Sequence, residues 1–438
     1  MSPEPLPPVL LANAEYYGTL AAVRCLGRAG VPIVIADPKW LTPAGWSRFV
    51  SRRLRSPSPD EPDQFIDWLL DFGRKNPGHV LYPTSDEMAW LLSAYRDDLA
   101  PLFHLYQPSF HTLDSLLDKR KLQALCEQVG LATPSSYTPS GATEIEAERD
   151  LETRVREGTL PLAFPLVIKP STQVLMRSRA KGAMVHGAAQ LIERYQAFRE
   201  KTNYHPMLSK RAPTAARPML QAYYKEAANG IYTISGFVND SGVVTALAAR
   251  KILQRPRNLG IGLCFEAADL DPQLLKGIEK LCRKVNYFGV LEAEFIEVAG
   301  RFLLIDFNPR FYGQMAFECD RGLLLPLLAY HAALGYRDSI RPLVKQRIAD
   351  CSATRAHPTA YTHRLNFEIV TRGQRVTGRM SPRDARAWRD WYRSHRDRMS
   401  YAVADRRDRV PAFIDLFNVL RGCLRHPRSF VRTMLLNR

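Results

Sequence analysis

The stretch that decides the fold reads Leu303-Leu304-Ile305-Asp306-Phe307-Asn308-Pro309-Arg310. An apolar strand ends here in an acid, an amide and a guanidinium. Because side chains alternate along a strand, Asp306, Asn308 and Arg310 are predicted to share one face, while Ile305, Phe307 and Pro309 point the other way. Carboxylate and amide oxygens are hard ligands that suit Mg²⁺, and substrate phosphates commonly complete its coordination. The stretch therefore predicts a magnesium-phosphate site at a strand end.

A second carboxylate is predicted beside this site. Residues 290–297 read as a strand that turns at Ala299-Gly300 and pairs with the stretch above as a hairpin. Glu294 then joins Asp306 and Asn308 as a predicted metal ligand. From spacing alone, an ordinary amphipathic hairpin with solvent-exposed acids remains an alternative.

The DFNPR motif at residues 306–310 resembles the E-x-N-P-R signature of the ATP-grasp enzymes, with Asp306 in place of the more usual glutamate. That family includes D-alanine ligase, biotin carboxylase and D-aspartate ligase, and uses ATP to activate a carboxylate as an acyl phosphate. The resemblance implies that Arg310 stabilises the acyl phosphate and the tetrahedral species that follows it.

Two upstream segments resemble the parts of the family that hold ATP phosphates. Residues 117–122 resemble the helix start of that family that carries an Asp-Lys pair, which is Asp118-Lys119 in this sequence. Residues 164–170 resemble the strand whose lysine, here Lys169, grips the phosphates. Both lysines are therefore expected to bind the nucleotide.

A third segment, residues 220–226, resembles the hinge that receives adenine. The resemblance implies that Gln221 and the backbone near Tyr224 hold the adenine and that Glu226 lies near the ribose. Adenine contacts in this hinge come mostly from backbone groups.

Two further segments resemble parts that cover the phosphates. The cationic loop before Gly182 is expected to close over them, with Lys181 as a phosphate contact; a solvated run of charges is the alternative. Residues 250–256 resemble the R-K-x-x-Q segment of carboxylate-amine ligase relatives. This implies catalytic roles for Arg250 and Lys251 at the phosphates and acceptor site.

The overall plan is most similar to the D-aspartate ligase and carboxylate-amine ligase branch. The resemblance implies small-molecule carboxylate and amine substrates, ATP, and one or two Mg²⁺ ions for which Mn²⁺ could substitute. The product would be an amide or peptide bond, with release of ADP and phosphate. Carboxylation or thioester formation on the same ATP site is one alternative, and a non-catalytic nucleotide-binding adaptor is another.

The length of 438 residues predicts two or three domains. We expect an α/β and α+β protein: a Rossmann-like pre-ATP-grasp domain over 1–112, and a two-lobed ATP-grasp domain over 113–340 with a lid at about 135–220. A basic helical extension is expected over 341–438. The first predicted strand is not followed by G-x-G-x-x-G, so a dinucleotide site lacks its main support.

Composition points to the cytoplasm. The sequence lacks a basic leader, an apolar run long enough to span a bilayer, and any C-x-x-C pair among its seven cysteines. We therefore expect a cytoplasmic protein. Peripheral association with the inner membrane surface is left open. A homodimer is also left open.

The net charge of +17 is concentrated in one region. Residues 341–438 hold 22 Lys and Arg against 8 Asp and Glu, which leaves 39 against 36 for the first 340 residues. A helix with a one-sided apolar stripe follows Pro411, and its basic surroundings fit an anionic membrane surface or a lipid-linked acceptor. A helix docked on the body, with its arginines in solvent, is the alternative. Nucleic acid is not an expected partner, because no recognised binding motif accompanies the charge.

Overall fold

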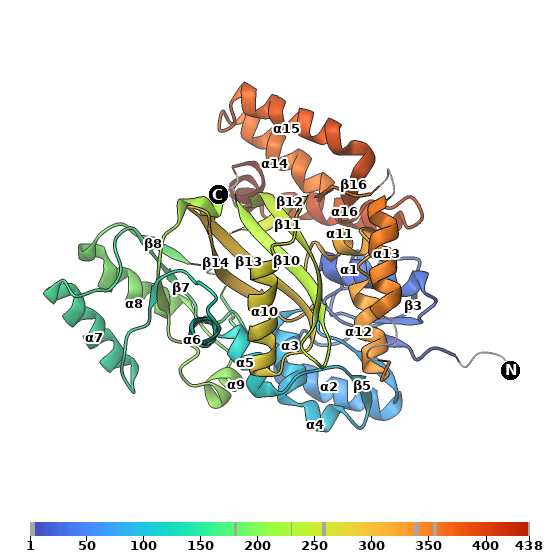
Figure 1. Ribbon diagram of the computed structural model, residues 1–438, viewed down its shortest axis with the longest axis horizontal. Coiled ribbons are helices and arrows are strands. Elements are labelled where there is room, and N and C mark those ends of the chain that lie inside the picture. The colour runs from blue at the N-terminus through green and yellow to red at the C-terminus, as the bar shows by residue number, and fades with distance from the viewer. Residues whose placement is uncertain are drawn as a thin grey trace.

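A computed structural model describes residues 5–178, 182–228, 230–255, 260–336, 341–353 and 357–436. Within these ranges the strands form three sheets, of five, seven and four strands. Figure 1 shows the seven-stranded sheet near the centre, with the lobe that carries α7 and α8 on one side and the N-terminal elements on the other.

The N-terminal sheet is fully parallel, in the order β3-β2-β1-β4-β5. Its strands are β1 (Val9–Leu11), β2 (Ile33–Ala36), β3 (Val50–Leu54), β4 (His79–Leu81) and β5 (Phe103–Leu105). Every residue of β1 and β2 is buried, as expected for parallel strands that are covered on both faces. The accompanying helices are α1 (Tyr17–Arg28), α2 (Pro62–Lys75), α3 (Asp86–Ala94), α4 (Arg96–Leu99) and α5 (Phe110–Leu117).

The four-stranded sheet is antiparallel, in the order β6-β9-β7-β8. Its strands are β6 (Ser136–Tyr137), β7 (Leu166–Lys169), β8 (Ala183–Val185) and β9 (Met219–Ala222). The helices of this part are α6 (Lys119–Val129), α7 (Glu144–Glu157), α8 (Leu191–Lys201) and α9 (Pro206–Arg211). Asp118 caps the N-terminus of α6, so Lys119 is the first residue of that helix.

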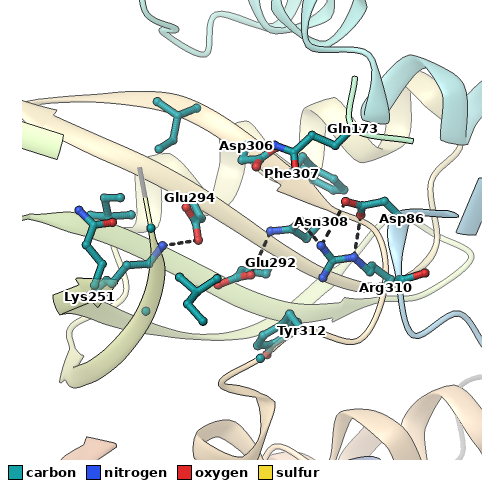
Figure 2. Close-up of a pocket in the computed structure, with 18 of the residues that line it drawn as sticks. Asp86, Gln173, Lys251, Glu292, Glu294, Asp306, Phe307, Asn308, Arg310 and Tyr312 are labelled. Carbon is teal, nitrogen blue, oxygen red and sulfur yellow. Dashed lines mark hydrogen bonds and ion pairs between the residues drawn. The ribbon is translucent and has the colours of Figure 1, made fainter. Parts of the chain in front are cut away.

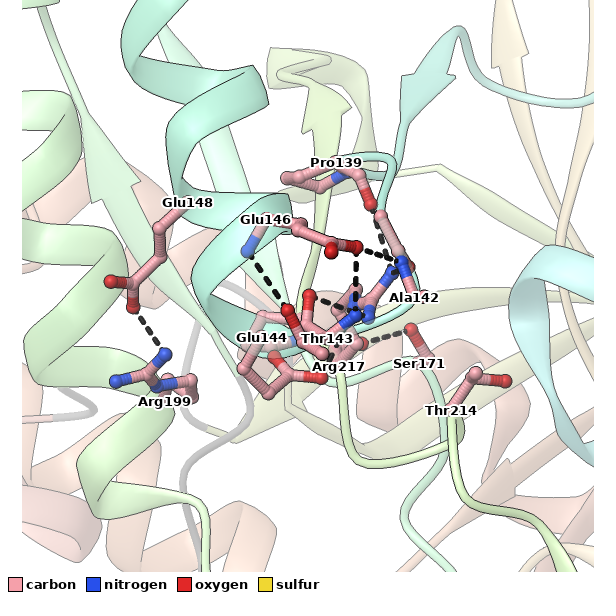
Figure 3. Close-up of polar contacts among 12 residues, drawn as sticks. Pro139, Ala142, Thr143, Glu144, Glu146, Glu148, Ser171, Arg199, Thr214 and Arg217 are labelled. Atoms are coloured by element: carbon pink, nitrogen blue, oxygen red, sulfur yellow. Dashed lines mark hydrogen bonds and ion pairs between the residues drawn. The ribbon is translucent and has the colours of Figure 1, made fainter.

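Buried Arg217 fixes the loop before α7 in this lobe (Figure 3). Its guanidinium donates to the carbonyl oxygens of Pro139, Gly141 and Thr143 and pairs with Glu144, at 3.0–3.3 Å. Thr143 and Glu146 add a reciprocal capping box at the start of α7. These contacts tie the loop and helix to the strand that leads into β9.

The seven-stranded sheet has the order β14-β13-β10-β11-β12-β15-β16. Its strands are β10 (Ile231–Val238), β11 (Val244–Arg255), β12 (Ile261–Ala268), β13 (Gly289–Val298), β14 (Arg301–Asn308), β15 (Ala360–Thr362) and β16 (Met399–Tyr401). Helix α10 (Pro272–Val285) packs on one face through Ile278 and Leu281, and α11 (Met315–Asp320) and α12 (Leu325–Ala333) follow β14.

The predicted hairpin is present as β13 and β14, and the register places Glu294 opposite Asp306. One prediction about this hairpin was wrong. Strict alternation placed both Ile305 and Phe307 on the other face. Both border the cavity, but Phe307 belongs to the buried core, whereas Ile305 does not. The register shifts after Glu294, so that Phe295 pairs with Leu304, and Ile305 is the extra residue of a bulge.

The region from residue 341 onward is helical in large part, as expected, but it also contributes two strands. The strands β15 and β16 extend the seven-stranded sheet. Its helices are α13 (Arg341–Ala353), α14 (Arg364–Val376), α15 (Pro382–His395), α16 (Val410–Arg425) and α17 (Pro427–Phe430). Phe367 packs against Trp388, Trp391 and Tyr392, so these aromatic side chains serve a small core between α14 and α15.

A buried ion pair joins this region to the N-terminal sheet. The Arg24 side chain on α1 donates to the Asp408 carboxylate at 2.8 Å and to the Val403 carbonyl oxygen at 2.8 Å. Ser47 and the backbone amide of Arg48 donate to the same carboxylate.

None of the described helices has the length and apolarity needed to cross a membrane.

We predict that Asp408→Ala lowers the free energy of unfolding by about 3–5 kcal/mol, because it leaves the buried Arg24 with only the more distant Asp405 carboxylate, at 3.9 Å. Asp71→Ala, which removes an exposed partner of Lys75, should cost less than about 1 kcal/mol. Urea titrations of both variants would measure the difference. Equal losses in the two variants would contradict a structural role for the buried pair.

Candidate active site

A cavity of about 830 Å³ opens between the four-stranded and seven-stranded sheets and reaches the N-terminal sheet. This volume is within the usual range for small-molecule sites. Nine of the twelve predicted site residues border the cavity, as listed here: Lys119, Lys169, Gln221, Tyr224, Lys251, Glu294, Asp306, Asn308 and Arg310.

The floor of the cavity is a row of polar side chains on β13 and β14 (Figure 2). Glu294 lies opposite Asp306, and Glu292 lies opposite Asn308. The Asn308 side-chain amide donates to the Glu292 carboxylate at 3.0 Å. Three carboxylates and an amide therefore share one face of a hairpin, where cross-strand neighbours are only about 4.5–5.5 Å apart at Cβ.

Two lysines neutralise the predicted metal ligands. The Lys251 ammonium on β11 lies 2.7 Å from the Glu294 carboxylate, and the Lys119 ammonium lies 2.5 Å from that of Asp306. Burial lowers the pKa of both lysines, but the facing carboxylates outweigh it and raise the pKa overall. Burial likewise raises the pKa of Asp306, but Lys119 outweighs it and lowers the pKa below its ordinary value.

Lys169 has a different environment. Burial and the neighbouring Lys119 charge lower the pKa of Lys169 to about 8. Its ammonium donates to the Gln221 side-chain oxygen at 2.7 Å, and Gln221 in turn donates to Ser136 at 3.3 Å. Among the described residues, no carboxylate is hydrogen-bonded to this largely buried ammonium group, so an anionic ligand would stabilise it.

Arg310 connects the hairpin to the N-terminal sheet. Its guanidinium pairs with Asp86 at the start of α3, at 2.6 Å, and donates to the Asn308 side-chain oxygen at 2.9 Å (Figure 2). Burial lowers the pKa of Arg310, but Asp86 outweighs it and raises the pKa. Arg310 is thus fixed in its charged form at the edge of the cavity.

Of the three other predicted residues, two lie outside the described cavity lining. Arg250 lies on β11 next to Lys251, but its side chain pairs with Glu297 at 2.7 Å and stacks over Tyr232, away from the described cavity lining. Adjacent strand residues face opposite sides, which is why only Lys251 points inward. Glu226 also lies outside the described lining. Lys181 is outside the described residues.

Sequence reasoning missed Glu292 and Asp86 as site residues. Burial and the neighbouring Glu294 raise the pKa of Glu292 to about 8. The sequence did indicate Glu292, because it lies two residues from Glu294 and strand alternation places both side chains on one face. Asp86 carried no comparable signal, since its partner Arg310 is 224 residues away in the chain.

The far wall of the cavity is formed by segments that lie outside the sequence motifs described above. Tyr17 on α1 and the residues Tyr361 and His363 at β15 line it. Asp415 on α16 lies behind this wall: it accepts from the Tyr17 hydroxyl at 3.3 Å and lies 3.5 Å from the His363 ring. Burial lowers the pKa of His363 to about 3, so this imidazole is neutral.

The residues present fit magnesium. Glu294, Asp306 and Asn308 offer hard oxygen donors on one face, and lysine ammonium groups now hold the two carboxylates. Within the described ranges, no three Asp, Glu, His or Cys side chains form a metal site by themselves. The candidate site therefore combines two carboxylates and an amide, and leaves room for ligands from a phosphate.

Neither a protein-family model nor a curated protein matches this chain. Solved structures do match. The biotin carboxylase domain of 2-oxoglutarate carboxylase from Hydrogenobacter thermophilus is 14% identical, with a TM-score of 0.57 over 74% of this chain and 69% of that chain. The L-amino acid ligase from Bacillus licheniformis is 15% identical, with a TM-score of 0.55 over 76% of each chain.

A third match is the N5-carboxyaminoimidazole synthetase from Staphylococcus aureus, 11% identical with a TM-score of 0.53 over 74% of this chain and 77% of that chain. These likenesses confirm the predicted fold: the chain has the ATP-grasp fold. Both a carboxylase domain and an amino acid ligase are among these solved structures.

We predict that Lys169→Met is more stable than the wild type at pH 7, by roughly 1–3 kcal/mol, because burial disfavours the charged lysine in the folded state. The gain should be full below a pH of about 8, the folded-state pKa, and should vanish as the pH approaches 10.5, the ordinary pKa of lysine. Thermal unfolding across this pH range would measure it.

Lys119→Met serves as the matched control. It should destabilise the protein at pH 7, because Asp306 loses its ammonium partner. The reverse order of the two variants would contradict the electrostatics described above.

Proposed function

We propose that this chain is an ATP-dependent ligase that activates a carboxylate as an acyl phosphate and joins it to an amine. The observation that carries the proposal is the polar row of Glu294, Asp306 and Asn308, flanked by Lys119 and Lys169, inside a cavity between the two sheets of an ATP-grasp fold. Phosphoryl transfer depends mainly on positioning and charge neutralisation, and these residues supply both.

The nucleotide is proposed to lie at the end of the cavity formed by the four-stranded sheet. Lys169 and Lys119 would bind its phosphates as point charges, and Gln221 and the backbone near Tyr224 would hold the adenine. Glu294, Asp306 and Asn308 would hold Mg²⁺, which when bound neutralises charge on the phosphates. Lys251 would then exchange its contact with Glu294 for one with a phosphate oxygen.

The reaction would proceed in two displacements. A carboxylate oxygen of the donor bonds to the γ-phosphorus while the bond between that phosphorus and the β,γ-bridging oxygen breaks, and ADP leaves. The amine nitrogen then bonds to the acyl carbon, the carbon-oxygen bond to phosphate breaks, and the amine loses a proton. Arg310 would stabilise the negative charge that develops on the acyl oxygen.

The charge of the cavity favours an amine as the second substrate. Besides the candidate metal ligands, the described lining includes four carboxylates: Glu15, Asp86, Glu87 and Glu292. With Glu294 and Asp306 they make six acids against four basic side chains in the described lining, namely Lys119, Lys169, Lys251 and Arg310, and this excess of acid suits a cationic amine. This is why we prefer an amine ligase to a carboxylase, although solved structures of both kinds share the fold.

Assembly is part of the proposal. The solved Hydrogenobacter thermophilus structure is described as a domain dimer. A homodimer is accordingly proposed for this chain.

ADP release with magnesium-ATP, measured against a panel of amino acids, small carboxylates and amines, tests this function. ADP release that requires both a carboxylate and an amine is the expected result. Glu294→Gln should lower the rate by about 100-fold or more, because it removes charge from the candidate metal site.

Glu297→Gln is the matched control on the same strand, since Glu297 pairs with Arg250 away from the cavity. Its rate should stay within a few fold of the wild type. Release that depends on bicarbonate and not on an amine would contradict the ligase assignment, and equal rates for the two variants would contradict the site.

A further inference from the structure

The most apolar face of α16 points to solvent. Its exposed side chains are large hydrophobic residues, with exposed fractions of 42–84% for Phe413, Leu416, Phe417, Leu420 and Leu424. Their spacing of three and four residues places all of them on one stripe of the helix. This orientation is the reverse of an ordinary surface helix, which turns its apolar stripe toward the core.

The opposite face of α16 fixes this orientation. Pro411 and Asp415 are buried, and Asp415 accepts from the Tyr17 hydroxyl. The Asn418 side chain donates to the Leu41 carbonyl oxygen at 3.1 Å. Because polar contacts hold the inner face, the helix cannot rotate its apolar stripe inward without breaking them.

The charge around the stripe is of one sign. Residues 409–436 contain five arginines and a single acid, the buried Asp415. Arg425, Arg428 and Arg432 are exposed at the C-terminal side of the stripe. The loop joined to α16 through Leu41 adds Trp40, which is 44% exposed and lies beside Arg53 and Arg55.

We propose that α16 binds an anionic membrane surface. Its apolar stripe would enter the boundary between headgroups and acyl chains, and the arginines would contact the lipid phosphates. This combination of an apolar stripe, basic flanks and an aromatic side chain is typical of helices that lie in the membrane interface. A protein partner is less suited, because uncompensated arginines around an apolar patch require a dense source of negative charge.

The position of α16 gives the binding a consequence for the cavity. Asp415 on its inner face contacts Tyr17 and His363, and both of these line the cavity. Since a helix is only about 10–12 Å in diameter, docking would hold the cavity within about one helix diameter of the lipid surface. The proposal goes beyond the ligase function and does not depend on it.

Sedimentation of the full chain with lipid vesicles tests this proposal. The wild type should sediment with vesicles of phosphatidylcholine plus phosphatidylglycerol but not with phosphatidylcholine alone, and high salt should weaken the binding. Phe413→Ser with Leu420→Ser should weaken it by at least about tenfold, because two exposed apolar side chains that would enter the lipid are lost.

The matched control is Ile145→Ser with Val376→Ser, which removes two exposed hydrophobic residues on α7 and α14. This control should bind like the wild type. ADP release with soluble substrates should be unchanged in both double variants, which separates membrane binding from catalysis. Equal melting temperatures would show that the α16 variant is folded.

Three outcomes would overturn the proposal. One is no binding of the wild type to the anionic vesicles. Another is equal loss of binding in the α16 variant and the control. The third is a wild-type dimer that binds no vesicles and becomes a monomer in the α16 variant, because the stripe would then be covered by a second copy of this chain.

Discussion

The pairing of β13 with β14 is the constraint on which the site depends. This register sets Glu294 against Asp306 and Glu292 against Asn308, so three carboxylates crowd one face of a hairpin inside the protein. Buried like charges are stable only when cations neutralise them or when one is protonated. Lys251 and Lys119 therefore reach the row from β11 and from the start of α6, and the pKa of Glu292 is raised to about 8. The same excess of acid is part of the reason why we propose metal-bound phosphates and an amine as ligands of this cavity.

The C-terminal region is a structural part of this cavity. The strands β15 and β16 extend the central sheet, and Tyr361 and His363 form part of the cavity wall. Arg24 and Asp408 bind the region to the N-terminal sheet through a buried ion pair. The charge predicted a basic helical extension. Its described lysines and arginines are exposed, apart from the half-buried Arg421, and they lie on elements whose inner faces are packed. Helix α16 differs from the other elements of this region, because its apolar stripe faces solvent.

The sequence predicted the fold, and nine of the twelve residues that it proposed for the site border one cavity. Residues such as Asp306, Asn308 and Lys169 lie at strand ends within short motifs, so local spacing located them. Arg250 was misplaced because a motif does not reveal which of two adjacent strand residues points inward. Ile305 was misplaced because a bulge breaks the alternation of β14. The pairing of Asp86 with Arg310 and the contacts of Asp415 with Tyr17 and His363 join segments far apart in the chain, which no local pattern encodes.

The formation of an acyl phosphate is the central claim, and transfer of an isotope tests it most directly. A donor carboxylate labelled with ¹⁸O would be incubated with magnesium-ATP and an amine, and the released phosphate would be examined by mass spectrometry. One ¹⁸O atom should appear in each phosphate, because the carboxylate oxygen that attacks the γ-phosphorus leaves with it. Phosphate without the label, despite formation of the amide, would contradict the account.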